Sequence, residues 1–216
     1  MSHIIAIDGP AGAGKSTIAR NLAQRLGYTY IDSGAMYRAI ALWAVREGVS
    51  LDDAYRLSQL AEAAVIELLP VRLNGEDVSD AIREPAISVA ASKVASIAGV
   101  RAALVAKQRQ FAASASVVME GRDIGTVVFP DARVKIFLDA HPEERVRRRS
   151  GDQPSVPPEQ LAVQIAERDR RDRQRTESPL VQAPDAAYVD STGLTTEQVE
   201  EEILAIVRSR ISNGKE

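Results

Sequence analysis

The sequence predicts an α/β fold built on a mostly parallel sheet, because short apolar segments alternate with helical patterns along its 216 residues. Several of these segments are unbroken apolar runs, as expected of strands that are buried on both faces. The predicted strands are His3–Asp8, Tyr28–Ile31, Val117–Glu120, Val134–Asp139 and Tyr188–Asp190. These segments predict a single five-stranded parallel sheet with helices packed against it.

Helical patterns fill most of the chain between these strands. They cover residues 15–26, 35–47, 52–64, 86–97, 100–114, 143–149, 157–175 and 195–210. The last of them carries a start signal, since Thr195 and Thr196 suit a helix cap and Glu197 adds an acidic side chain in the first turn.

Two segments depart from this alternation. Asn74-Gly75 lies between β-compatible flanks in Val71–Val78, and this pair is a strong signal for a hairpin turn. We therefore expect a small antiparallel insert at about residues 65–85. The polar stretch Ser150–Pro158 separates two basic helices, and it suits either a lid over a ligand or a plain surface connection.

The composition excludes several classes of protein. Apolar residues make up 45% and charged residues 26%, which is typical of a globular chain. The absence of cysteine excludes disulfides and thiolate metal sites, and two histidines are too few for a zinc centre built from imidazoles. The apolar runs are shorter than the ~20 residues of a membrane span, and the N-terminus lacks the basic region of a signal peptide. The net charge of −3 argues against a nucleic-acid coat protein.

The segment Gly9–Thr17 matches the phosphate-binding pattern G-x4-G-K-[ST] in full, between a predicted strand and an amphipathic helix. Its glycines let the backbone bend so that N–H groups point at phosphate oxygens, and the start of the following helix adds a positive dipole end. In such a P-loop, Lys15 reaches the β- and γ-phosphates and the Ser16 hydroxyl holds Mg²⁺. The predicted ATP contacts of the loop are Gly9, Pro10, Ala11, Gly12, Ala13, Gly14, Lys15, Ser16 and Thr17. Switches, motors and small-molecule kinases share this loop, which does not choose among them.

Further polar motifs follow predicted strands, where ligands gather in open α/β sheets. Ser33, Tyr37 and Arg38 follow the second strand and suit a second polar ligand; the structural alternative is a serine cap with Tyr37 packed into the core. The motif Glu120–Asp123 ends the third strand, and it offers an acidic partner for magnesium beside a cation that faces a ligand.

The basic helix near residue 170 offers a more specific pattern. Arg168, Asp172 and Arg175 fall at i, i+4 and i+7 and so share one face. Two arginines beside one aspartate suit a ligand that carries a phosphate and a ribose diol. The alternative is a solvated helix with ion pairs worth ~0.3–0.5 kcal/mol each. Upstream, Arg145 and Arg149 share a face and suit contacts to an adenine ring or the γ-phosphate.

Taken in order, the motifs GPAGAGKST, DSGAMYR, ASKVAS, EGRDIGTVVFPDA, KIFLDA and ERDRRDR resemble those of bacterial-type cytidylate kinases over nearly the whole chain. The EGRDIGTVVFPDA and ERDRRDR blocks are specific to that family among nucleoside-monophosphate kinases. The resemblance implies a three-layer α/β/α P-loop kinase fold in a single domain spanning residues 1–216. It also implies a monophosphate-binding insert at about 65–95 and a lid loop at about 150–157.

The resemblance further implies a reaction, the transfer of the γ-phosphoryl group of ATP to CMP or dCMP with Mg²⁺ as cofactor. Ser33, Arg101 and Asp123 would then read the cytosine edge, with Ser92 and Arg175 close to the base. An acceptor phosphate is already ionised at neutral pH, so no strong general base is required.

The phosphate side of CMP is assigned in the same way. Tyr37, Arg38, Arg122 and Arg168 are similar to the residues that surround the CMP phosphate, and Asp172 is similar to the one that binds the ribose hydroxyls. The expected catalytic groups are Lys15, Arg122, Arg168 and Asp172.

Some features match the family less closely. Arg145 and Arg149 resemble the lid cations on the ATP side more loosely, and Glu120, a candidate magnesium ligand through water, stands where many members have aspartate. The segment before the hairpin is also shorter than in some members, which suggests a reduced insert.

Two alternatives remain, another small P-loop kinase and a GTPase-like switch, although the chain lacks the N-K-x-D motif of a switch. We expect a cytoplasmic monomer that binds small molecules and neither nucleic acid nor membranes.

Overall fold

The computed structural model describes residues 3–212, and the chain divides into two compact units. The first unit comprises residues 1–31 and 112–216, and the second comprises residues 32–111. In the described part, no single helix is both long and apolar enough to cross a membrane, although the bent pair Pro85–Val94 and Ala98–Ala112 passes by length and composition.

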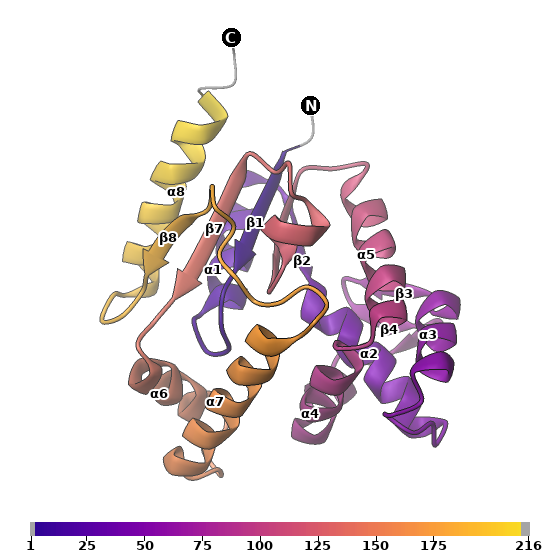
Figure 1. Ribbon diagram of the computed structural model, residues 1–216. Helices are drawn as coiled ribbons and strands as arrows, with labels where there is room; N and C mark the ends of the chain where they lie inside the picture. Colours follow the sequence, from indigo (N-terminus) through magenta and orange to yellow (C-terminus); the bar gives the residue numbers. More distant parts are fainter. Residues whose placement is uncertain (1–2, 213–216) are drawn as a thin grey trace. The chain divides into compact units, whose positions relative to one another are not determined.

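The first unit is built on a five-stranded sheet with the strand order β2-β6-β1-β7-β8 (Figure 1). Its strands are β1 (Ile4–Asp8), β2 (Thr29–Asp32), β6 (Val117–Gly121), β7 (Val134–Asp139) and β8 (Ala187–Asp190). The central β1 pairs in parallel with β6 and β7, and β7 pairs in parallel with β8. Strands β1, β6 and β7 are almost completely buried, which explains their unbroken apolar sequences. The predicted α/β class and five-stranded parallel sheet are confirmed.

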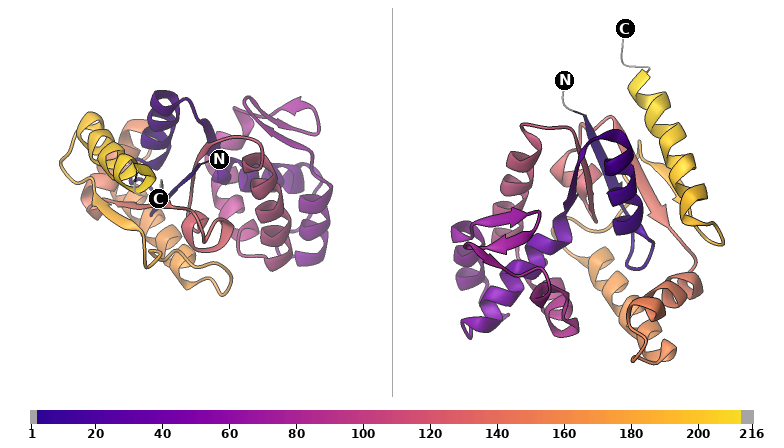
Figure 2. Two further views of the ribbon diagram at one scale, coloured as in Figure 1. Left: turned by 90° about the horizontal axis from the view of Figure 1, so that it is seen from above. Right: turned by 180° about the vertical axis from the view of Figure 1, so that it is seen from behind.

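Helices α1 (Lys15–Leu26) and α8 (Thr196–Ser212) pack on the sheet and on each other, as the view from behind in Figure 2 shows. Ile18 and Leu22 of α1 and Ile203 of α8 contribute to the apolar cluster beneath them. The predicted cap of α8 is present, since the Thr195 hydroxyl accepts from the Gln198 N–H at 3.3 Å. The Gln198 side chain accepts in return from the Thr195 N–H at 2.8 Å, which completes a capping box.

Helices α6 (Pro142–Asp152) and α7 (Pro158–Gln174) follow β7 in the chain. The sequence pattern placed the end of α6 near residue 149, but the helix continues to Asp152. Ser150, expected in a loop, lies within the helix, and its hydroxyl donates back to the Val146 carbonyl at 3.0 Å. The connection between the two helices is therefore limited to residues 153–157.

The second unit surrounds the buried helix α2 and carries a three-stranded antiparallel sheet of order β3-β4-β5. Its elements are α2 (Ser33–Arg46), α3 (Ala54–Ala63), β3 (Ile66–Leu68), β4 (Val71–Leu73), β5 (Glu76–Asp77), the short 3₁₀-helix Ala81–Arg83, α4 (Pro85–Val94) and α5 (Ala98–Ala112). Asn74 and Gly75 have φ values of 52° and 86°, so both adopt the left-handed conformation that a type I′ hairpin turn requires. The predicted hairpin is confirmed.

Candidate active site

The P-loop, residues Gly9–Thr17, connects β1 to α1 and lies against the end of β7. A Cβ atom on Gly9 would lie 1.9 Å from the Leu138 carbonyl oxygen, and the φ of Gly9 is 149°. Gly12 and Gly14 also have positive φ, at 79° and 89°. Only glycine allows this backbone path at residue 9, so the glycine pattern reflects a close approach of loop and strand.

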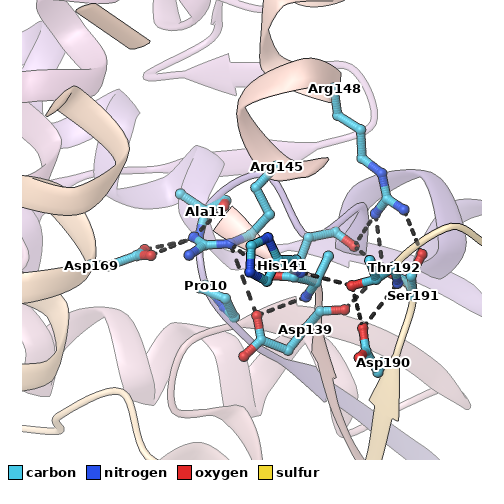
Figure 3. Close-up of polar contacts among 12 residues, drawn as sticks. Pro10, Ala11, Asp139, His141, Arg145, Arg148, Asp169, Asp190, Ser191 and Thr192 are labelled. Carbon is cyan, nitrogen blue, oxygen red and sulfur yellow. Dashed lines mark hydrogen bonds and ion pairs between the residues drawn. The ribbon is translucent and has the colours of Figure 1, made fainter. Parts of the chain in front are cut away.

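The carbonyl groups of the P-loop are held by cations of the protein itself (Figure 3). Lys15 Nζ donates to the Pro10 carbonyl at 2.7 Å, and Arg145 Nη1 donates to the Ala11 carbonyl at 3.0 Å. Arg145 also forms an ion pair with Asp169 of α7, whose other oxygen accepts from the Ala11 N–H at 3.2 Å. These contacts fix the direction of the loop's peptide groups.

Lys15 is a buried cation among other cations. Lys15 is only 5% exposed. Burial, together with the charge of Arg122, lowers the pKa of its ammonium group to about 7. The carboxylate of Glu120 opposes this shift, and the charge of Arg168 adds to it. A cation destabilised in this way gains strongly from an anionic ligand, because the phosphates of a nucleotide would supply the missing negative charge.

The oxygen donors near the P-loop fit a magnesium ion that is shared with a nucleotide. Ser16 lies exposed in the first turn of α1, and Glu120 is buried at the end of β6, where it accepts from the Tyr30 hydroxyl at 2.7 Å. Within residues 3–212 there is no group of three or more acidic, histidine or cysteine side chains that could hold a metal. A Mg²⁺ ion bound with substrate phosphates takes only one or two oxygen ligands from the protein, so Ser16 and Glu120 fit such an ion by their chemistry.

Asp8 is a component of the site that the sequence analysis missed. Its carboxylate accepts from the Ile124 and Gly125 N–H groups at 2.8 and 2.7 Å. Burial raises its pKa to about 6, against the effect of these two hydrogen bonds. They anchor the π-helical turn Ile124–Val128, which begins directly after Asp123. An acidic residue that ends an apolar strand is the signal that could have found it.

A second ionic cluster joins the end of β6 to α7. Arg122 Nε donates to Asp172 Oδ2 at 2.9 Å, and Arg175 Nη1 lies 3.8 Å from Asp172 Oδ1. Burial alone would raise the pKa of Asp172, but the charges of Arg122, Arg168 and Arg175 outweigh it and hold the pKa below its ordinary value. The structure thus brings Arg122, Arg168, Asp172 and Arg175 together, and their expected roles toward CMP stay predictions.

The free energy of unfolding should include a contribution from the ionised Asp172, and this contribution should change with pH. We expect Asp172→Asn to lower the melting temperature at pH 7 by several degrees, since removing one partner of a buried ion pair costs roughly 3–5 kcal/mol. The folded state holds the pKa of Asp172 below the ordinary 3.8, so its contribution is complete above that value and is lost as pH falls through the folded pKa. The difference between wild type and variant should therefore narrow in acid.

Thermal melts of both proteins between pH 3 and 8 measure this effect. Asp152→Asn is the matched control, because Asp152 is an exposed partner of Arg149 at 3.5 Å. A difference between wild type and Asp172→Asn that stays constant down to pH 3 would contradict the ionic role of Asp172.

The two predicted lid cations differ in their surroundings. Arg145 is buried and donates to the Ala140 and Ala11 carbonyls, at 3.1 and 3.0 Å. Arg149 is partly exposed and pairs only with Asp152 among the ion pairs of the described chain. Arg145 thus contacts the P-loop itself, and direct contacts of either side chain to ATP stay predictions.

In the second unit, the start of α2 differs from the serine cap considered above. Asp32 caps the helix, accepting from the Ala35 N–H at 3.0 Å, and it pairs with Arg38 at 2.6 Å. Ser33 is buried at the first helical position. The serine cap is therefore wrong, because the preceding aspartate takes that role and leaves Ser33 one position inside the helix.

The remaining candidates of this unit lie on α2, α4 and α5. The Arg101 guanidinium carbon lies 5.4 Å from the centre of the Tyr37 ring, and Arg101 Nη1 donates to the Ala95 carbonyl at 3.0 Å. Ser92 is buried on α4, and its hydroxyl has no hydrogen-bond partner among the described residues. A buried polar atom of this kind is expected to meet a ligand or water.

Comparisons with known proteins place these features in a family. The sequence profile of cytidylate kinase matches residues 5–209. The chain belongs to the cytidylate kinase family. A relative from Solibacter usitatus, named cytidylate kinase, is 61% identical and covers 99% of this chain and 95% of its own length. Another cytidylate kinase, from Geobacillus kaustophilus, is 50% identical and covers 96% of this chain and 97% of its own length.

Solved structures agree with the fold that the cytidylate kinase family implies. A gluconokinase from Sinorhizobium meliloti superimposes with a TM-score of 0.50 at 16% identity, covering 98% of this chain and 94% of that one. An uncharacterized protein from Eubacterium ventriosum superimposes with a TM-score of 0.56 at 13% identity, covering 96% and 99%. At such identities the likeness concerns the fold alone. Membership in the cytidylate kinase family rules out the switch-like alternative.

Proposed function

We propose that the protein is an ATP-dependent kinase that transfers the γ-phosphoryl group of ATP to CMP or dCMP, giving ADP and CDP or dCDP. The observation that carries the proposal is the buried Lys15 in a complete P-loop, within a chain of the cytidylate kinase family. The relatives that match almost the whole chain are named cytidylate kinases, which supports the same activity.

The chemistry asks for positioning and charge neutralisation more than for a base. The acceptor is a phosphate oxygen of CMP, which is ionised at neutral pH and can attack the γ-phosphorus directly. Negative charge then spreads over the oxygens of the transferred group. Lys15, Arg122 and Arg168 are cations whose charges act on one another in the first unit, and we propose that they offset this charge.

Ser16 and Glu120 would hold Mg²⁺, Glu120 through a water molecule. When bound, the ion would supply positive charge to the phosphate oxygens of ATP. The Tyr30 hydroxyl, which donates to Glu120 at 2.7 Å, orients that carboxylate.

We propose that CMP is bound by two groups of residues. Those expected around the base are Ser33, Ser92, Arg101, Asp123 and Arg175, and those expected around the phosphate and ribose are Tyr37, Arg38, Arg122, Arg168 and Asp172. The buried Ser92 hydroxyl without a partner and the ionised Asp172 among arginines support these assignments. We also expect a monomer in the cytoplasm. Size-exclusion chromatography with light scattering would test the oligomeric state.

The activity is tested by ADP release in a coupled assay with ATP, Mg²⁺ and one monophosphate at a time. We expect the kcat/KM of CMP and dCMP to be at least tenfold higher than that of UMP, because two buried polar groups of the base site that lack hydrogen-bond partners on uracil cost roughly 1–3 kcal/mol each. AMP and GMP should scarcely be used. Turnover of AMP or GMP in preference to CMP would overturn the proposed substrate.

The base preference gives a prediction for Asp123. Cytosine presents an N4 donor and an N3 acceptor where uracil presents an O4 acceptor and an N3–H donor, so a carboxylate that accepts from N4 favours cytosine. We expect Asp123→Ala to narrow the CMP-to-UMP ratio of kcat/KM more than it lowers activity on UMP. The exposed Asp131 provides the matched control, Asp131→Ala, which should keep the wild-type ratio. An unchanged ratio in Asp123→Ala would exclude Asp123 as the reader of the base.

A further inference from the structure

The peptide group between Ala13 and Gly14 is held by a side chain outside the P-loop. Arg148 Nη1, on α6, donates to the Ala13 carbonyl at 3.2 Å. In a trans peptide the C=O and N–H groups point in opposite directions, so the group that holds the Ala13 carbonyl also aims the Gly14 N–H. Because Gly14 has no side chain, its backbone permits several orientations of this peptide group. A hydrogen bond from outside the loop can therefore select one of them.

The Arg148 guanidinium is committed to acceptors of the protein (Figure 3). Its Nε donates to Glu144 at 2.8 Å, Nη1 also donates to Ser191 Oγ at 2.9 Å, and Nη2 donates to the Ser191 carbonyl at 2.7 Å. With the bond to Ala13, four of its five N–H groups are occupied. Because these N–H groups already have protein acceptors, we expect its effect on a nucleotide to pass through the loop and not through a direct phosphate contact.

Ser191 cannot substitute for Arg148 at the Ala13 carbonyl. The Ser191 hydroxyl has one proton and two carbonyl acceptors within reach, that of Asp139 at 2.9 Å and that of Ala13 at 3.4 Å. The shorter contact takes the proton. Ser191 therefore ties Arg148 to the end of β8, while the Ala13 carbonyl depends on Arg148.

We propose that Arg148 is a positioning residue for ATP binding, which turns the Ala13 carbonyl toward α6 and so presents the Gly14 N–H to the phosphates. This inference rests on the proposed function insofar as the P-loop binds ATP. The two neighbouring arginines that the sequence singled out act elsewhere, since Arg145 holds Ala11 and Arg149 pairs with Asp152.

Arg147 offers a control within the same helix. Its side chain is 74% exposed, and both of its hydrogen bonds go to Glu144, at 2.8 and 2.7 Å. Arg147→Ala therefore removes one arginine and one Glu144 pair, as Arg148→Ala does, without touching the P-loop.

The experiment compares wild type, Arg148→Ala, Arg148→Lys and Arg147→Ala in two ways. Calorimetry measures the Kd of ADP with Mg²⁺, which needs no turnover, and steady-state assays give kcat and KM for ATP and for CMP. We expect Arg148→Ala to raise the Kd of ADP and the KM of ATP about tenfold or more, with the KM of CMP changed less than about twofold. Arg148→Lys, which keeps a donor of reduced reach, should lie between, and Arg147→Ala should match wild type.

Two results would overturn the proposal. One is an Arg148→Ala protein that binds ADP as tightly as Arg147→Ala; the other is an equal rise in the KM of ATP and of CMP, which would indicate general loosening. If circular dichroism shows that Arg148→Ala does not fold, the same comparison of the Kd of ADP and the KM values is made between Arg148→Lys and Arg147→Ala. A wild type that binds ADP but does not phosphorylate CMP would contradict the proposed function alone, because the calorimetric comparison still tests Arg148.

Discussion

The Lys15→Met variant should lose nearly all turnover while keeping its fold. Lys15 is buried, and the nearby Arg122 adds to the destabilisation of its charge, so the negative charge of a nucleotide phosphate would favour its ammonium form beyond what the Pro10 carbonyl supplies. Methionine is unbranched like lysine and one atom shorter, so it keeps most of the apolar stem while it removes the charge and the hydrogen bond to Pro10. Loss of one preorganised electrostatic contact in an active site costs about 10²–10³ in kcat. The measurement is kcat in the coupled ADP-release assay with ATP and CMP.

The pH dependence of the melting temperature provides a second test of Lys15→Met. Folding lowers the pKa of Lys15 from 10.5 to about 7, so the unfolded chain binds the extra proton between these values and wild-type stability rises with pH across that interval. Lys15→Met lacks this group, so its melting temperature should show less of the rise. The assignment of Lys15 is wrong if a correctly folded variant retains more than about a tenth of the wild-type kcat.

Substitutions on α7 and at Arg175, which directly follows the helix and does not lie within it as predicted, should divide by whether the arginine lies beside Asp172. We expect Arg168→Ala and Arg175→Ala each to lower kcat/KM for CMP about 10²-fold or more, because each removes a charge beside the buried Asp172. Arg170 and Arg173 are exposed on the other side of the helix. Exposed ion pairs contribute ~0–1 kcal/mol, so alanine at either position should lower kcat/KM less than about fivefold.

Measuring kcat/KM for all four variants under identical conditions tests the shape of the cluster. The exposed pair serves as the matched control, since each variant removes one arginine from α7 or from the position directly after it. Equal losses in the four proteins would mean that α7 is a diffuse basic surface and that the resemblance to the family's CMP site misleads at these positions.

The parts of the structure that follow from local sequence were predictable. The buried strands β1, β6 and β7 have unbroken apolar sequences, and the P-loop is a contiguous pattern whose Gly9, Gly12 and Gly14 adopt the positive φ values that glycine allows. The hairpin at Asn74-Gly75 follows from two positive φ values that this pair tolerates. In each case neighbouring residues carry the whole signal.

The parts that rest on distant contacts were not predictable. Asp8 accepts from N–H groups that lie 116 and 117 residues later, and Asp169 contacts Ala11 across 158 residues. Arg145 and Arg149 look alike in sequence, at i and i+4, yet only Arg145 points into the P-loop. Helical spacing assigns a residue to a face but does not say which partner that face meets.

The anchoring of the turn Ile124–Val128 by Asp8 couples two stretches that the sequence keeps far apart. Asp8 immediately precedes the P-loop, and its two short buried hydrogen bonds end on the residues after Asp123. One carboxylate therefore connects the strand that leads into the phosphate-binding loop with the turn that follows the proposed reader of cytosine. Thermodynamic linkage acts equally in both directions, so we expect any coupling that this contact carries between the two nucleotides to be reciprocal.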